Sequence, residues 1–139
     1  MPSATLPCPC GRLDARRRRR SLGDCCGPHL ADPVGCPAAD AEVLMRSRYA
    51  AFACREIAYL LATWHPDTRP STLDWDPATK WLGLEVRRHR VLSLDTAEVE
   101  FVARSSLGGR AHRLHELSRF RREGDRWYYL DGSFHGRST

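Results

Sequence analysis

The chain has 139 residues, of which 42% are hydrophobic and 28% charged, values typical of a soluble globular protein. No run of about 18 apolar residues occurs, so no membrane-spanning helix is expected. The N-terminus, MPSATLPCPC, lacks the basic and apolar regions of a secretory signal, and we expect a cytoplasmic protein. The net charge of +5 is local, because the run Arg16 to Arg20 accounts for it.

Four of the six cysteines lie in two close pairs near the N-terminus. Cys8 and Cys10 flank a proline, and Cys25 and Cys26 are adjacent. In a reducing compartment, closely spaced cysteines are more often metal ligands than disulfides. Residues 1 to 36 contain few large apolar side chains, so zinc held by four thiolates would supply stability that packing cannot. We predict a structural zinc site; the alternative is reduced, unbound thiols in an irregular tail.

The cysteine pattern resembles the SEC-C motif, a small zinc module of the form CPCG, spacer, then Cys-Cys or Cys-His. The spacer between Cys10 and Cys25 has fourteen residues, longer than is usual in that family, and a longer loop costs little closure entropy. Adjacent ligands require a sharp backbone turn, with which Gly27 is consistent. His29 could replace one cysteine, whereas Cys36 and Cys54 are not expected to be ligands.

The run Arg16, Arg17, Arg18, Arg19 and Arg20 lies in the spacer between the cysteine pairs. Five consecutive like charges repel one another and stay solvated, which indicates a flexible exposed loop. The alternative is a finger that contacts the phosphates of ribosomal or other RNA, an attraction that weakens with salt. No aromatic residue interrupts the run, so it offers no platform for base stacking.

Residues 27 to 39 contain three prolines and two glycines and are interpreted as a connector. Asp40 is a plausible N-cap for the helical segment that follows, which Pro66 should end. The region around Arg55 is expected to divide this segment into two helices. Its apolar stripe comprises Met45, Tyr49, Phe52, Ala53, Ile57, Leu60, Leu61 and Trp64.

The same helical segment carries polar groups that could border a pocket. Arg46 and Arg48 cannot both face the core. One interpretation assigns Tyr49 and Trp64 to packing and the arginines to solvent or ion pairs. The functional alternative places an arginine and His65 at the mouth of a pocket, to which Tyr49, Trp64 and Glu116 are also assigned.

From Trp81 onward the apolar period changes to two, which is typical of strands. A short helical turn is expected before it, near residues 71–75. Gly108-Gly109 and Glu123-Gly124-Asp125 indicate turns between strands. Two helices followed by antiparallel strands indicate an α+β fold in which a curved sheet wraps the helices. The inner face should carry Leu82, Leu84, Val86, Ala97, Val99, Phe101, Ala103, His112, Leu114, Glu116, Ser118 and Phe120.

Glu116 is expected to point inward, because it shares a strand face with Leu114 and Phe120. A buried carboxylate needs a partner, which Arg46, Arg48 or His65 could supply. Asp131 has a similar status. Glu116 is therefore either a member of a buried ion pair or a general base.

Six segments together resemble the YchJ-like family of bacterial proteins, which has no established activity. They are LMRSRYAAF, YLLATWHP, WLGLEV, VEFVAR, ELSRF and WYYLDG, and the resemblance covers residues 8 to about 133. It implies a SEC-C zinc module joined to a nuclear transport factor 2-like domain, a cone of the cystatin-like class. We assign the module and linker to residues 1–36 and the cone to residues 37–139.

Three functions are compatible with these features, and the oligomeric state stays open. The first is a zinc-containing interaction protein whose cone binds a protein partner or a small ligand. The second is an isomerase, dehydratase or hydrolase, with Glu116 or Asp131 as general base, His65 as acid or base and Tyr49 as hydrogen-bond donor. The third is a ribosome- or RNA-associated protein that uses the arginine run.

Overall fold

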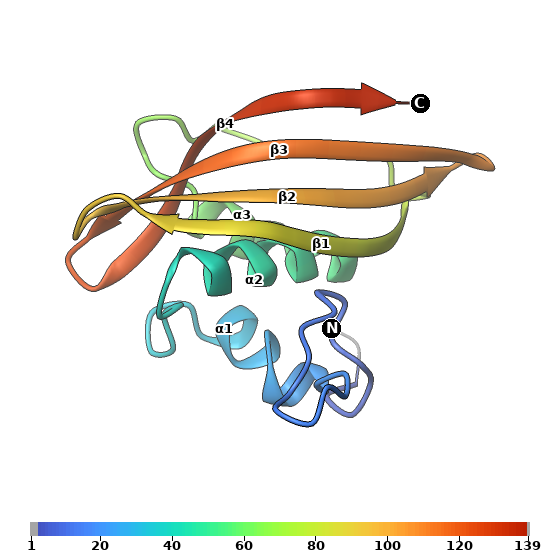
Figure 1. The fold of residues 1–139 in the computed structure, drawn as a ribbon, viewed down its shortest axis with the longest axis horizontal. Helices are drawn as coiled ribbons and strands as arrows, with labels where there is room; N and C mark the ends of the chain where they lie inside the picture. Colours follow the sequence, from blue (N-terminus) through green and yellow to red (C-terminus); the bar gives the residue numbers. More distant parts are fainter. Residues whose placement is uncertain (1–2, 139) are drawn as a thin grey trace.

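The computed structural model describes residues 3–138. Met1, Pro2 and Thr139, which the two expected domains include, lie outside the described residues. A four-stranded antiparallel sheet covers one side of the long helix α2, and the N-terminal module lies on the opposite side of that helix (Figure 1). Within residues 3–138, no helix has the length and apolar character needed to cross a membrane.

The order of elements confirms the expected α+β class, with the helices first and the strands after them. The sheet has the simple order β1-β2-β3-β4, and every pair is antiparallel. The helices are η1 (Leu22–Asp24), α1 (Gly27–Ala31), α2 (Ala41–Cys54) and α3 (Ile57–Ala62). The strands are β1 (Lys80–Val91), β2 (Thr96–Leu107), β3 (Arg110–Glu123) and β4 (Arg126–Ser138).

Helix α2 begins and ends at local signals that the sequence contains. The Asp40 side chain accepts a hydrogen bond from the backbone N–H of Val43 at 2.8 Å, which confirms the predicted N-cap. Arg55 adopts a left-handed conformation with φ of 61° and separates α2 from α3, as the predicted interruption requires. Two other predictions were wrong, because α1 occupies part of the expected connector and no helical turn forms at residues 71–75.

The helical segment ends earlier than its predicted end at Pro66. Helix α3 ends at Ala62, and the next residues pair with β4. The N–H of Tyr129 donates to the carbonyl of Thr63 at 2.8 Å, and the N–H of His65 donates to the carbonyl of Tyr129 at 2.7 Å. This short pairing places the rings of Trp64 and Tyr129 edge to face, with their centroids 5.0 Å apart.

The inner face of the sheet follows the predicted alternation at all but one position. Both predicted turns are present, and glycines with positive φ occupy them at positions 108, 109 and 124. Leu82 is the exception, since it is 61% exposed. A register shift between Trp81 and Gly83 turns Trp81 inward in its place.

Module, helices and sheet share one hydrophobic core. Buried residues continue from Cys8 and Leu22 in the module, through Leu44 in α2, to Val99 and Phe120 in the sheet. Helix α2 is therefore buried on two sides, against the module and against the sheet (Figure 1). Residues on both sides of the expected domain boundary at residue 36 contribute to this continuous core.

Candidate metal centre and ligand cavity

Two tight backbone turns carry the four N-terminal cysteines. Gly11, with φ of 74°, follows Cys10 and donates its N–H to the carbonyl of Cys8 at 3.2 Å. Cys25 is the C-cap of η1 and Cys26 is the N-cap of α1, so the junction between two short helices provides the sharp turn that adjacent ligands need. Gly27 does not provide it through a positive φ. A Cβ there would lie 2.7 Å from the carbonyl oxygen of Leu22, so glycine permits close packing at this point.

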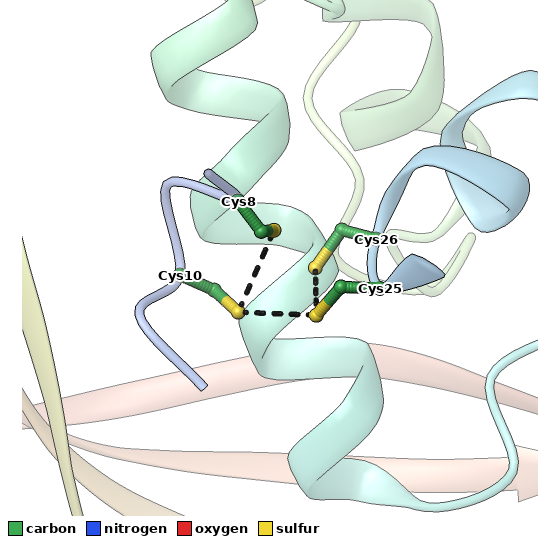
Figure 2. Close-up of side chains that lie close together, drawn as sticks. All are labelled: Cys8, Cys10, Cys25 and Cys26. Carbon is green, nitrogen blue, oxygen red and sulfur yellow. Dashed lines mark hydrogen bonds between the residues drawn. The ribbon is translucent and has the colours of Figure 1, made fainter. Parts of the chain in front are cut away.

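The four thiol sulfurs converge on a common centre. Figure 2 shows one pair of cysteines facing the other, next to α2. Neighbouring sulfurs are 3.7 Å apart for Cys8 and Cys10, 3.6 Å for Cys10 and Cys25, and 3.9 Å for Cys25 and Cys26. All four lie within 4.8 Å of one another. A tetrahedral site with zinc–sulfur bonds of about 2.3 Å requires sulfurs about 3.8 Å apart, so these residues fit a metal ion.

Crowding makes the four thiols share their protons unequally. Hydrogen bonds from Cys25, Cys26 and Cys8 lower the pKa of Cys10 far below its ordinary value, while Cys10 raises the pKa of Cys25 and of Cys26. Cys10 also acts to raise the pKa of Cys8, but Cys25 and Cys26 outweigh it and hold this pKa at about 7. The cluster therefore favours a thiolate at Cys10 and opposes further negative charge on Cys25 and Cys26, and a divalent cation would remove that opposition.

The remaining cysteines and His29 lie outside this cluster. The Nδ1 atom of His29 is 2.7 Å from the carbonyl oxygen of Cys36 and 3.6 Å from its sulfur. Cys54 is half-buried near the end of α2, and burial raises its pKa. His29 therefore contacts Cys36 instead of replacing a cysteine in the cluster.

The arginine run forms the end of a small hairpin. Leu13 pairs with Arg19, and the side chain of Asp14 accepts the N–H groups of Arg16 and Arg18 at 2.8 and 3.0 Å. The side chains from Arg16 to Arg19 are exposed. The long spacer thus projects away from the metal centre as a turn of defined conformation, which is why its length leaves the four sulfurs together.

A cavity of about 300 Å³ lies between the helices and the inner face of the sheet. Its volume is at the lower end of the range for small-molecule sites. The walls are mostly apolar and aromatic, with a few polar side chains from α2, β3 and β4. The lining residues are Met45, Arg48, Tyr49, Phe52, Trp64, Trp81, Phe101, Ala103, Leu114, Glu116, Ser118 and Tyr129.

Arg48 is the buried cation of this cavity, with only 4% of its surface exposed. Its Nη1 donates to the carbonyl of Leu60 and to the hydroxyl of Thr63, both at 2.8 Å, and so caps the end of α3. The guanidinium also lies over the rings of Trp64 and Tyr129, at 5.2 and 4.8 Å from their centroids. Burial lowers the pKa of Arg48 to about 10, so it remains charged at neutral pH.

Glu116 is the buried anion, and it points inward as predicted. Its Oε2 accepts hydrogen bonds from the hydroxyls of Ser118 at 2.5 Å and Tyr129 at 3.3 Å. Burial and the proximity of Glu116 raise the pKa of Tyr129, so this tyrosine remains a neutral donor. Within the described part of the chain, no ion pair closer than 4.0 Å joins Arg48 to Glu116.

Three residues expected near this site do not line the cavity. Arg46, two residues before Arg48 on the helix, faces the module, where it pairs with Glu42 at 2.9 Å and donates to the carbonyl of Cys10. The Nε2 of His65 is 2.6 Å from Glu123, and its ring packs against Tyr128.

Asp131 is the third of these residues. It lies opposite Arg119 in the sheet and pairs with it at 2.6 Å on the exposed surface. Cross-strand partners share a face of the sheet, and this face is the outer one.

The sequence prediction of the pocket also omitted residues that line it, notably Trp81, Ser118 and Tyr129. Ser118 was detectable, because strand alternation places it on the same face as Glu116. Tyr129 was not, because a register shift in β4 puts it on the inner face while Asp131 lies on the outer one. Trp81 was not, because a bulge reverses its orientation. Its indole N–H is buried and has no hydrogen-bond partner among the described residues.

Comparisons with known proteins agree with this architecture. Residues 40–132 match the family model described as "YchJ, middle NTF2-like domain". UPF0225 proteins from Polaromonas naphthalenivorans and Polaromonas sp. strain JS666 are 57% and 58% identical. These alignments cover 92% and 95% of this chain, and 97% and 98% of the relatives.

Two solved structures share the fold along nearly the whole chain. A SEC-C motif containing protein from Rhodopseudomonas palustris has a TM-score of 0.78 and 35% identity, covering 92% of this chain and 98% of its own. A second SEC-C motif containing protein, from Psychrobacter arcticus, has a TM-score of 0.78 and 32% identity. This match covers 98% of the present chain and 86% of the Psychrobacter chain. The chain therefore belongs to the YchJ-like UPF0225 family, and its residues 40–132 form the family's nuclear transport factor 2-like domain.

Proposed function

We propose that the protein is a zinc-containing binding protein. In this proposal, zinc in the N-terminal module is structural, and the cone receives a small molecule. The observation that carries the binding function is the cavity of about 300 Å³, whose walls hold the buried charges of Arg48 and Glu116. Buried ionisable groups in a mostly apolar pocket are typical of ligand-binding and active sites.

Cys8, Cys10, Cys25 and Cys26 would hold the zinc ion. A set of four cysteines is closed, with no position left for substrate, which favours a structural role. Zinc with four thiolates carries two negative charges, and Arg19 and Arg46 lie near enough to bond the carbonyls of Cys8 and Cys10. Reduced thiols require a reducing compartment, so we also propose a cytoplasmic location.

Metal content tests the zinc site directly. Mass spectrometry of protein purified under reducing conditions should find about one zinc ion per chain, as expected for one four-cysteine site. The Cys25→Ser/Cys26→Ser variant should lack it. The matched control, Cys36→Ser/Cys54→Ser, removes two cysteines outside the cluster and should retain the metal. Wild-type protein without metal would contradict the zinc proposal.

A cavity-filling substitution tests the ligand site. Ala103 lines the cavity, so Ala103→Leu should block the binding of small aromatic compounds found by an NMR screen of the wild type. Ala78→Leu adds the same atoms at an exposed turn and should leave binding unchanged. Equal binding by the two variants would show that the compounds bind elsewhere.

The exposed arginine hairpin and the module would contact a protein partner in this proposal. Capture of one specific partner by wild type, and its loss with Cys25→Ser, would support that role. Recovery of the same proteins with both forms would contradict it.

A second candidate function is proton-transfer catalysis with Glu116 as general base. Two hydroxyl donors hold Oε2, which leaves Oε1 to accept a proton from a substrate in the cavity. Tyr49 also lines the cavity, and burial raises its pKa to about 12, so it would stay a neutral donor. His65 and Asp131 have no role in this candidate, because they lie outside the cavity.

Nitrobenzisoxazole is a suitable probe of such a base. Glu116 would remove the ring C–H proton as the nitrogen–oxygen bond breaks, and a coloured nitrile phenolate would form. Glu116→Gln should abolish this reaction, whereas Glu85→Gln, on the exposed surface, should not alter it. A wild-type rate equal to that of buffer would rule out this base function for the probe.

A further inference from the structure

We propose that the cone cavity selects a neutral, planar molecule that carries both a hydrogen-bond acceptor and a hydrogen-bond donor. The simplest example is an aromatic amide. This inference rests on the proposed ligand-binding function and defines the chemical class of the ligand. It follows from four features of the wall: an open donor, an open acceptor, the separation of their charges and the aromatic lining.

The open donor is the guanidinium of Arg48. Only Nη1 has partners, namely the carbonyl of Leu60 and the hydroxyl of Thr63. Nε and Nη2 donate to no acceptor among the described residues. Both atoms remain accessible to a water-sized molecule. Because Arg48 lines the cavity, these N–H groups remain available to an acceptor on a ligand.

The open acceptor is the carboxylate of Glu116. Oε2 is held by Ser118 and Tyr129, whereas Oε1 has no hydrogen-bond partner within the described part of the chain. Oε1 is likewise not sealed from a water-sized molecule. Glu116 can therefore accept one hydrogen bond from a ligand without losing those that position it.

Arg48 and Glu116 line the same cavity but do not form a direct ion pair with each other. A ligand with a net negative charge would be attracted by Arg48 but repelled by Glu116, and the reverse holds for a ligand with a net positive charge, so neither gains from both groups. A charged ligand would also lose its hydration in a largely apolar cavity. A neutral molecule with one acceptor and one donor satisfies both groups and leaves their charges balanced.

The remaining wall favours a flat ligand. Aromatic rings come from α2, the segment after α3, and three strands, and a planar molecule can stack on their faces or edges. The rings belong to Tyr49, Phe52, Trp64, Trp81, Phe101 and Tyr129.

Four probes of similar size test the inference by NMR titration of the full-length protein. Toluene has no polar group, benzoate is an anion with acceptors only, benzylamine is a cation with donors, and benzamide is neutral with both. We expect benzamide to bind roughly tenfold more tightly than each of the others, because toluene lacks both hydrogen bonds, and benzoate and benzylamine each lack one and meet a like charge. This ranking uses the wild type alone, so it does not depend on whether a variant folds.

The Glu116→Gln variant then tests the role of the carboxylate. Loss of its negative charge should weaken benzamide binding several-fold and strengthen benzoate binding, because the repulsion disappears. The control, Glu85→Gln, removes a charge from the exposed face of β1 and should preserve the wild-type ranking.

The possible failures are distinguishable. If toluene binds as tightly as benzamide, the cavity binds ligands but does not select this class, and only the present inference is overturned. Preference for benzoate or benzylamine would overturn it in the same way. If none of the four probes binds and Ala103→Leu changes nothing, the proposed ligand-binding function fails as well.

Discussion

Gly132 leaves the space that the carboxylate of Glu116 occupies. A Cβ atom at position 132 would overlap Oε2 and the carboxyl carbon and would lie 3.0 Å from Cγ of Glu116. Gly132 is the register partner of Ser118, one of the two residues that hold this carboxylate. The glycine on β4 is thus part of the arrangement that keeps an acidic side chain buried on β3.

Gly132→Ala should therefore destabilise the protein by about 1–3 kcal/mol, the usual cost of overpacking a buried site. Urea unfolding measures this change. Gly83→Ala is the control, because a Cβ there has no atom within 4 Å. In a Glu116→Ala background the same glycine substitution should cost much less, and an equal cost in both backgrounds would contradict the steric relationship.

Removal of metal should lower the stability of the whole chain, not only of the module, because the two share one core. At a free zinc concentration 100 times Kd, bound metal would contribute about 2.7 kcal/mol. Urea unfolding with zinc and with a chelator measures this difference. Cys25→Ser/Cys26→Ser should be insensitive to zinc, and a stable sheet domain unaffected by chelator would contradict the expectation.

Stability should fall at alkaline pH partly because of Tyr59. Burial raises its pKa from 10.0 to about 12, and Ser47, 2.7 Å from its hydroxyl, acts to lower it. The folded state thus favours the protonated form. The contribution of Tyr59 to the free energy of unfolding is fully present below pH 10. It is lost between pH 10 and about 12, by up to about 1.4 kcal/mol per pH unit.

The difference in unfolding free energy between wild type and Tyr59→Phe, measured from pH 8 to 12, isolates this contribution. Arg48 acts in the opposite direction, since its lowered pKa means that the unfolded state holds the proton more tightly above pH 10. Because both proteins contain Arg48, its effect largely cancels. A difference that does not change with pH would contradict the assignment to Tyr59.

The arginine hairpin should affect binding to polyanions but not stability. Replacing Arg16, Arg17 and Arg18 by glutamine should change the unfolding free energy by less than about 0.5 kcal/mol, because these side chains are exposed. Affinity for single-stranded RNA at low salt should fall, together with its salt dependence. Replacing Arg87, Arg90 and Arg104, exposed on β1 and β2, removes the same charge and should have a smaller effect. Equal loss would indicate attraction by net charge alone.

Local signals in the sequence determined much of the fold. The cap of α2 by Asp40 was predictable because the bond joins residues close in the chain. The turns at Gly108, Gly109 and Gly124 were predictable because glycine readily adopts the positive φ that they require. Alternation likewise directed Glu116 inward, because adjacent strand residues face opposite sides. The cysteine pattern suggested ligands whose sulfurs the structure brings together.

The composition of the cavity depended on tertiary structure. The bulge at Trp81 and the pairing of residues 63–65 with β4 arise from contacts between distant segments, so neither has a local signal. The same pairing directs His65 to Glu123 and away from the cavity. Helix periodicity showed only that Arg46 and Arg48 face different ways. Which one is buried depends on the sheet lying on one side of α2 and the module on the other, a choice made when the shared core packs.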